Sequence, residues 1–260
     1  MALMLIDSHC HLDYFSAEEA PQILARAWEA GVGELVTIGT RLSRAPEQLA
    51  LAESAENIWC TVGTHPHHAA EEELPQEQDI LDLLSHPKVI AVGEAGLDYF
   101  YDRSPRDVQA EVFRRQIRAA RAGGVPICIH TRDADDDTLA MLQNERATGG
   151  HFDFLLHCFS SGRALAEQAV ELGGYVSFSG ILTFPKSNEL RAIAADLPAE
   201  CLLVETDSPY LAPVPFRGKR NEPAHVAHTA KVLADLRGLT PEALADLTTR
   251  NFRRLFRKAA

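Results

Sequence analysis

Short apolar segments recur along the whole chain, separated by longer segments in which apolar residues have helical spacing. The apolar segments are six to eight residues long, the length typical of β-strands. They lie at residues 3–10, 34–39, 58–63, 89–94, 125–130, 152–158, 174–179 and 201–206. Strand and helix patterns that alternate from end to end predict an α/β fold with a parallel sheet.

The helical patterns fill most of the intervals between these strands and follow the last one. We predict helices at residues 21–30, 46–55, 108–122, 136–145, 164–172, 189–197, 225–236 and 241–256. Pro241 at the start of the last helix and Gly238 just past the preceding one are the boundary residues expected of helices.

Eight strands with intervening helices favour a closed (β/α)8 barrel, the TIM barrel, over an open sheet. The chain has 260 residues, close to the roughly 250 of one such barrel, so we predict a single domain over 1–260. An open doubly wound sheet would call for a phosphate-binding GxGxxG or P-loop sequence after an early strand, and neither occurs.

Six side chains of the types that bind metals follow or end five of the predicted strands. These residues are His9, His11, Glu94, His130, His157 and Asp207. The C-terminal ends of all strands in a parallel barrel meet at one mouth, so residues distant in sequence would share one pocket. Each of the six, taken alone, could equally well be a buried polar residue with hydrogen-bond partners in the core. All six at the same level of a barrel indicate a metal centre.

The size and chemistry of this set favour two metal ions over one. Six ligands exceed the four of a tetrahedral zinc site, but they suit two ions about 3.5–4 Å apart that share a bridging carboxylate. Histidine with carboxylate fits zinc, manganese or iron, and magnesium is a further candidate although it prefers oxygen ligands. Such a centre predicts a metal-dependent hydrolase.

Charge argues against a broad surface for duplex DNA. The formal net charge is −12, whereas proteins that hold duplex DNA non-specifically present a wide basic face. A phosphorylated substrate held locally by metals and a few arginines stays compatible with this charge. The N-terminal MALMLIDSH has no basic region or cleavage site of a secretory signal, and no apolar run is long enough to span a bilayer, so we expect a cytoplasmic protein.

The five cysteines do not indicate a disulfide framework. Their number is odd and there is no CxxC pair, so we expect buried, reduced thiols. Cys10 and Cys158 adjoin proposed ligands, but strand residues alternate sides and both should point away from the metals. Cys128 should point into the barrel.

Seven short motifs are spread over nearly the whole chain. They are DSHCHLD (7–13), GTHPH (63–67), GEAGLDY (93–99), HTRDA (130–134), LHCFSSG (156–162), ETDSPYL (205–211) and RGKRNEP (217–223). On these motifs the chain resembles the TatD-type metal-dependent deoxyribonucleases of the amidohydrolase superfamily. LHCFSSG departs from the family locally, with serines where a Thr-Gly sequence is expected.

The resemblance implies a division of the six ligands between two sites. His9, His11 and Asp207 would hold one ion, His130 and His157 the second, and Glu94 would bridge them. Barrel relatives often bridge with a carboxylated lysine instead. The only lysine near the fourth strand, Lys88, precedes that strand and lies at the wrong end.

Several residues around the ligands are candidates for catalysis. We expect Asp207 to act as the general base, because it can both bind a metal and accept a proton from water. Glu205 and Asp7 lie two residues before ligands, on the same side of their strands, and we expect them to orient histidine rings. The alternative for both is a buried ion pair with a purely structural use.

Substrate contacts are expected from the loops around the mouth. His65 follows the third strand and would hold a phosphate or the leaving group, and Arg132 and Arg217 would bind phosphates. A solvated loop charge is the alternative for the arginine-rich segment 217–220. We expect His67 and His68 to be exposed loop histidines.

Three other patterns are not interpreted as functional sites. Asp133, Asp135 and Asp137 imitate a calcium loop, but no glycine follows at the required position and a helix begins there. The basic residues between 250 and 258 are typical of a helix C-terminus. The aromatic residues at 99–101 either stack bases or cap the barrel, and the sequence does not choose between these roles.

The main functional hypothesis is an exonuclease that hydrolyses phosphodiester bonds at the ends of single-stranded or frayed DNA. The second is an amide or ester hydrolase of the same superfamily, for example one that removes an aminoacyl group from RNA. The third is a non-catalytic binding protein with the same fold. The presence of all six ligands argues against the third. No membrane association and no obligate protein partner are expected.

Overall fold

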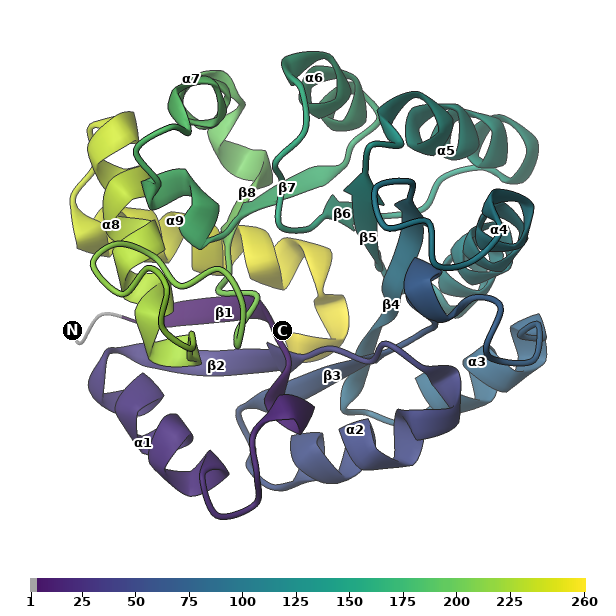
Figure 1. The fold of residues 1–260 in the computed structure, drawn as a ribbon, viewed down its shortest axis with the longest axis horizontal. Coiled ribbons are helices and arrows are strands. Elements are labelled where there is room, and N and C mark those ends of the chain that lie inside the picture. Colours follow the sequence, from purple (N-terminus) through teal and green to yellow (C-terminus); the bar gives the residue numbers. More distant parts are fainter. Residues whose placement is uncertain (1–3) are drawn as a thin grey trace.

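Eight parallel strands form one sheet that curls into a nearly closed barrel with helices around its outside (Figure 1). This confirms the predicted TIM barrel. The computed structural model describes residues 4–260, so residue 3, the predicted start of the first strand, lies outside the described residues. The strands follow one another around the sheet in chain order. They are β1 (Leu5–Cys10), β2 (Val32–Thr37), β3 (Ile58–Val62), β4 (Val89–Asp98), β5 (Ile127–Arg132), β6 (Phe154–Leu156), β7 (Tyr175–Phe178) and β8 (Leu202–Val204).

Every predicted helix is present, with ends shifted by up to four residues. The helices are α1 (Ala20–Glu29), α2 (Ala45–Glu53), α3 (Glu77–Leu84), α4 (Arg106–Gly123), α5 (Asp135–Gly149), α6 (Arg163–Glu171), α7 (Asn188–Asp196), α8 (Val226–Arg237) and α9 (Pro241–Leu255). The helix α3 was not among the predicted ones. It has only eight residues, and just two of its side chains, Ile80 and Leu84, are buried against the barrel.

The fourth strand is longer than its apolar segment. It continues past Glu94 to Asp98 and pairs with β5 along its whole second half. Gly93 and Gly96 have φ angles of +143° and +138°, which L-residues with side chains rarely adopt. A Cβ atom on Gly96 would collide with the carbonyl oxygen of His130. Gly93 therefore lies in the register shift between Val92 and Ala95, Gly96 permits the close approach of β5, and neither glycine ends the strand.

The last helix closes one end of the barrel. Phe252 and Phe256 join an apolar cluster with strand residues from inside the barrel, including Ile90 and Cys128. Lys258 donates a hydrogen bond to the carbonyl oxygen of Val89, the first residue of β4. The closed end is therefore the N-terminal end of the strands, which leaves the C-terminal end as the mouth.

Four of the five cysteines are buried as the strand pattern predicts. All five are free, and four are buried while Cys158 is half-buried. Cys10 belongs to the layer between the strands and the outer helices, and Cys128 lies inside the barrel. None of the helices in residues 4–260 combines the length and apolar character needed to cross a bilayer. The expected cytoplasmic location stays a prediction.

Candidate metal centre

The ring of strands closes at the point where β1 meets the segment after β8. Asp207 N–H donates to the carbonyl oxygen of His9 at 2.9 Å, and His11 N–H donates to that of Ser208 at 2.8 Å. Two peptide segments almost 200 residues apart in sequence are thereby held side by side. As a result, Nε2 of His11 lies 3.4 Å from Oδ1 of Asp207.

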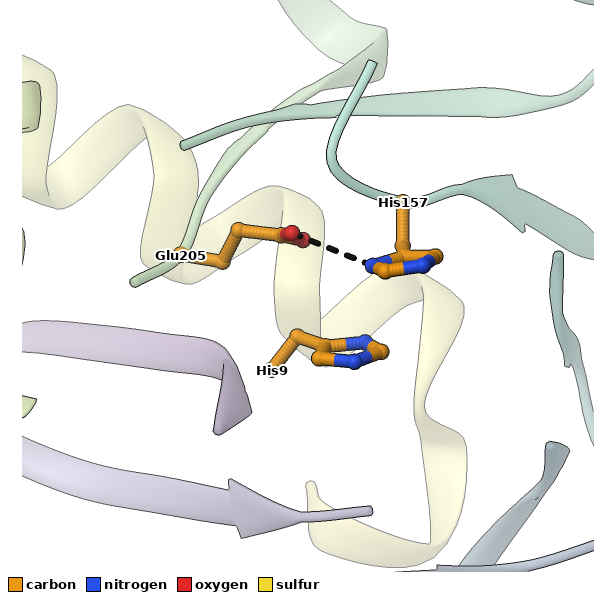
Figure 2. A group of neighbouring side chains, drawn as sticks. All are labelled: His9, His157 and Glu205. Atoms are coloured by element: carbon orange, nitrogen blue, oxygen red, sulfur yellow. Dashed lines mark hydrogen bonds and ion pairs between the residues drawn. The ribbon is translucent and has the colours of Figure 1, made fainter. Parts of the chain in front are cut away.

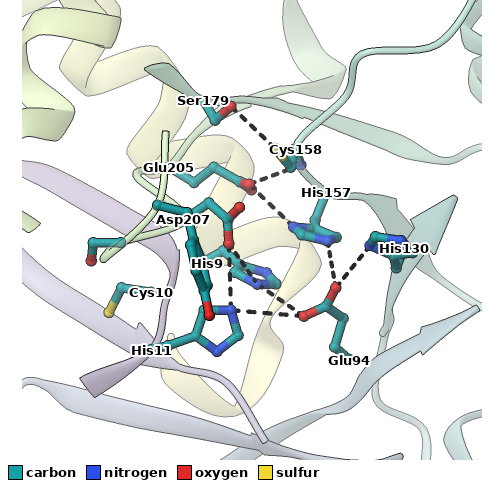
Figure 3. A network of polar contacts seen from close by, with 12 residues as sticks. His9, Cys10, His11, Glu94, His130, His157, Cys158, Ser179, Glu205 and Asp207 are labelled. Atoms are coloured by element: carbon teal, nitrogen blue, oxygen red, sulfur yellow. Dashed lines mark hydrogen bonds and ion pairs between the residues drawn. The ribbon is translucent and has the colours of Figure 1, made fainter. Parts of the chain in front are cut away.

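Glu94 occupies the middle of the candidate site and turns its two carboxylate oxygens toward different histidines (Figure 3). Oε2 lies 3.4 Å from Nε2 of His9 and 3.8 Å from Nε2 of His11. Oε1 lies 2.8 Å from Nε2 of His157 and 3.1 Å from Nδ1 of His130. One carboxylate therefore faces two groups of ligand-type atoms, which is the arrangement needed to bridge two ions.

Among residues 4–260, ligand-type atoms gather within 4.8 Å of one another in three groups, two of which share His9. The groups are His9, His11 and Asp207; His65, Glu94 and His130; and His9, His157 and Glu205. The rings of His9 and His157 are stacked 3.8 Å apart and nearly parallel, at 8°, and Glu205 contacts His157 from the side (Figure 2). All six residues predicted as ligands are thus brought together at the mouth.

Buried carboxylates hold the rings of His157 and His130 in fixed orientations. Oε1 of Glu205 lies 3.2 Å from Nδ1 of His157, and Oδ2 of Asp98 lies 2.9 Å from Nε2 of His130. In each case the other ring nitrogen points toward Glu94. A carboxylate on one nitrogen places the proton there and leaves the second nitrogen free for a metal.

The electrostatics of the site suit cations. Burial by itself would raise the pKa of Glu94, but His157, His65 and His130 around it hold that pKa well below its usual range. Burial likewise opposes ionisation of Asp207, yet contacts with His11 lower its pKa. Both carboxylates are therefore anionic in a buried setting, which is costly without positive charge nearby.

An unpartnered nitrogen atom also fits a metal centre. Among residues 4–260, Nε2 of His9, the ring nitrogen that faces Glu94, is buried without a hydrogen-bond partner. Buried polar atoms normally have partners. Burial lowers the pKa of His9, with a further contribution from His157, and a neutral imidazole is the form that binds metals. The donor set is imidazole and carboxylate, as zinc, manganese or iron sites require.

His65 lies inside the centre and carries a neutral ring. Its Nε2 is 3.2 Å from Oε1 of Glu94, and its Nδ1 accepts a hydrogen bond from His67 N–H at 3.0 Å. Burial lowers the pKa of His65 to about 3, despite the opposing effect of Glu94. The Nδ1 contact places the proton on Nε2, so His65 is a neutral donor directed into the site.

The two arginines predicted to bind phosphate are exposed at the mouth. The guanidinium of Arg132 lies 4.0 Å from the ring centroid of Phe100 and 4.9 Å from that of Tyr101. The guanidinium of Arg217 lies 4.4 Å from the ring centroid of Phe184. Aromatic faces hold both cations in place. Phosphate binding by either arginine stays a prediction.

A cavity of about 830 Å³ opens next to Arg132. Phe100 and Tyr99 line one part of it, and the aspartates at 133, 135, 136 and 137 line another. Three of these aspartates form the first turn of α5, as the sequence indicates, where the helix dipole stabilises negative charge. The cavity is therefore strongly acidic.

Two expectations about neighbouring residues are wrong. Neither His67 nor His68 is an exposed loop histidine, because both lie in the 3-10 helix Pro66–His68 and their side chains are only 16% and 19% exposed. Nε2 of His67 lies 2.8 Å from Oδ2 of Asp98. Asp7 does not contact a histidine ring. Its carboxyl group accepts from the backbone N–H of Thr206 at 2.8 Å and contacts the Thr206 hydroxyl at 2.5 Å.

Sequence reasoning missed Asp98 altogether. This residue is fully buried and contacts both His67 and His130. The only signal was its place in GEAGLDY, four residues after Glu94. Residues four apart in a strand lie on the same face, so a predicted strand that extended to residue 98 would have placed Asp98 beside Glu94.

Comparisons with known proteins agree with this geometry. The family model described as TatD related DNase matches residues 6–257. The metal-dependent hydrolase YcfH of Escherichia coli is 41% identical, with 98% of this chain and 96% of that protein covered. A protein of Shigella flexneri named 3'-5' ssDNA/RNA exonuclease TatD is 34% identical, with 92% and 94% covered. Among solved structures, YjjV of Escherichia coli, a TatD homologue, superposes with a TM-score of 0.88 at 30% identity, covering 99% of both chains.

Proposed function

This chain belongs to the TatD-related family of metal-dependent hydrolases, and on that premise we propose that it is an exonuclease acting on the ends of single-stranded or frayed DNA. The observation that carries the proposal is the carboxylate of Glu94, whose two oxygens face different groups of histidines. A bridged pair of ions is a common solution for in-line displacement at phosphorus. The choice of nucleic acid as substrate is supported by the relative named 3'-5' ssDNA/RNA exonuclease TatD.

The proposed ligands divide around Glu94. His9, His11 and Asp207 would hold one ion, and His130 and His157 the other. The chemistry that such ions supply when bound is activation of water at neutral pH and polarisation of a phosphoryl oxygen.

Asp207 is the proposed general base. Its pKa is lowered by His11, so its carboxylate is available to accept a proton at neutral pH. Its side chain is 14% exposed, whereas that of Glu94 is 4% exposed. Asp207 is therefore the more accessible of these two carboxylates.

The other residues would position the reacting groups. Glu205 holds the His157 ring and is assigned a supporting role in catalysis. His65 would donate a hydrogen bond from its Nε2–H to a phosphate oxygen or to the leaving group. Arg132 and Arg217 would neutralise phosphates of the bound strand, because a guanidinium can donate two parallel hydrogen bonds to one phosphate.

End-directed cleavage follows from the shape and charge of the mouth. A barrel mouth admits one or a few nucleotides of a free end more readily than the middle of a duplex. The net charge of −12 also leaves no wide positive surface for duplex DNA.

The test is a hydrolysis assay with linear and circular single-stranded DNA of the same sequence, with aminoacyl-RNA as a separate substrate. We expect the linear form to be degraded, the circle to resist, and chelator to abolish activity until a divalent metal is restored. Equal cleavage of circle and line would contradict end entry. Deacylation of aminoacyl-RNA without cleavage of either DNA would replace the nuclease by an ester hydrolase.

A further inference from the structure

Two exposed tyrosines form a continuous aromatic surface beside the metal centre. Tyr14 is 46% exposed and Tyr210 is 48% exposed. Their rings meet edge to face, with centroids 5.8 Å apart. Both rings also contact His11, at centroid distances of 5.6 and 6.2 Å. The surface therefore begins at a proposed ligand and extends into solvent.

The loop after β8 fixes the backbone under both rings. Arg220 donates to the carbonyl oxygen of Tyr14 at 2.5 Å and forms an ion pair with Glu19 at 2.9 Å. The buried side chain of Asn221 donates to the carbonyl oxygen of Tyr210 at 2.6 Å. Because neighbouring residues of one loop hold both tyrosines, the two rings are preorganised as a unit. These contacts give Arg220 a structural use.

Charge distinguishes this side of the mouth from the opposite one. The other exposed aromatic pair, Phe100 and Tyr101, surrounds Arg132 at the edge of the cavity lined by four aspartates. In the loop that follows Tyr210 in the chain, Arg217 lies over the ring of Phe184 and Lys219 over that of Phe216, and within residues 4–260 neither forms an ion pair. The tyrosine pair does not line the acidic cavity, so a polyanionic strand that stacks on it avoids repulsion by the four aspartates.

We propose that Tyr14 and Tyr210 form the surface on which a base at the end of the nucleic acid stacks while its phosphodiester lies at the metal centre. This rests on the proposed nuclease function. Aromatic rings stack on any base, because every base has a π-face, so the surface would select base-bearing ends without reading sequence. Its contribution is to positioning, and it leaves the chemical step to the metal centre.

The test compares two single-stranded oligonucleotides of equal length. One carries natural bases throughout, and the other has abasic tetrahydrofuran residues at the last three positions of both ends. Tyr14→Leu and Tyr210→Leu should each raise KM on the natural oligonucleotide by roughly fivefold to a hundredfold, with kcat little changed. Neither substitution should alter hydrolysis of the abasic oligonucleotide. Tyr14→Phe and Tyr210→Phe retain the ring and should keep KM near that of the unaltered protein.

Equal losses on the natural and abasic oligonucleotides, or no loss with either leucine variant, would overturn the stacking surface and leave the nuclease function standing. If the unaltered protein hydrolyses neither oligonucleotide, the nuclease proposal fails instead. Binding of the same oligonucleotides, measured by fluorescence anisotropy with chelator present, then decides the stacking question. Preferential binding of the natural oligonucleotide that both leucine variants weaken would support stacking, and equal binding of the two would refute it.

Discussion

Nε2 of His130 lies 2.9 Å from Oδ2 of Asp98, and the same carboxylate oxygen is 2.8 Å from Nε2 of His67. Burial alone would raise the pKa of Asp98, but hydrogen bonds from His130 and His67 hold that pKa far below its usual range. The opposite ring nitrogen of His130, Nδ1, faces Glu94 at 3.1 Å. Asp98 therefore fixes which nitrogen of His130 is available to a metal.

Asp98→Asn should weaken metal binding at the site that contains His130 by about 10- to 100-fold. The amide loses the negative charge, and its NH2 group cannot accept a hydrogen bond, so it cannot serve both the two histidines and the backbone N–H of Tyr101, which donates to the other carboxylate oxygen. Competition with a chromophoric chelator measures the affinity. Asp102→Asn, at an exposed position in the loop that follows β4, is the matched control and should leave the metal affinity unchanged. Unchanged affinity in Asp98→Asn would show that His130 needs no such support.

Asp207→Asn should reduce turnover far more than substrate binding. The amide has no basic oxygen for the proton of water, and loss of a general base lowers kcat by about 100- to 10,000-fold. Initial rates over a range of single-stranded DNA concentrations separate kcat from KM, and metal analysis of the same preparation monitors the ligand role of Asp207. Asp235→Asn, on the exposed face of α8, is the control. A kcat within a few-fold of the unaltered protein would remove Asp207 as the base.

Asp7 should make the metal-free protein less stable as pH rises. Burial raises the pKa of Asp7 to about 8, although hydrogen bonds from Thr206 act to lower it. The folded chain thus keeps a proton that the unfolded chain releases above about pH 4, so unfolding free energy falls between about pH 4 and 8. At about 1.4 kcal/mol per pKa unit, the full effect is on the order of 5 kcal/mol.

Asp7→Asn should remove this dependence, because the amide mimics the protonated acid and keeps its contacts with Thr206. Urea unfolding of chelator-treated protein at several pH values measures the pH dependence of the unfolding free energy. The stability of Asp7→Asn relative to the unaltered protein should improve steadily from pH 5 to 8. The exposed residue Asp246 provides the control variant Asp246→Asn. Parallel pH profiles for Asp7→Asn and the unaltered protein would mean that Asp7 is ionised in the folded state.

The barrel and the gathering of the six proposed ligands could be predicted because both depend on local patterns. Short apolar segments identify strands, and parallel strands bring their C-terminal ends to one mouth. Asp98 was missed because Gly93 and Gly96 resemble a strand end, whereas here Gly93 lies in a register shift within β4 and Gly96 permits the close approach of β5. Asp7 was misassigned because the pairing of β1 with β2 also shifts between Asp7 and Cys10, which breaks the two-residue alternation.

Contacts between distant loops could not be predicted from one sequence. Arg220 contacts Glu19 and Tyr14, about 200 residues earlier in the chain, and no local pattern indicates that pairing. The aromatic pair of Tyr14 and Tyr210 depends on the same closure of β1 against the segment after β8. Such pairings follow from the closed ring of strands, so they become visible only once the fold is known.

The bridging role of Glu94 is the central claim, and the number of metal ions bound per chain tests it most directly. Inductively coupled plasma mass spectrometry should find about two divalent ions per chain in the metal-reconstituted protein. Glu94→Gln should lose metal from both sites, because one anionic carboxylate serves both. His157→Ala should lose mainly one ion. Glu145→Gln, which alters another buried carboxylate paired with Arg118 on the outer helices, should keep both. Full metal content in Glu94→Gln, equal to that of the unaltered protein, would contradict the bridge.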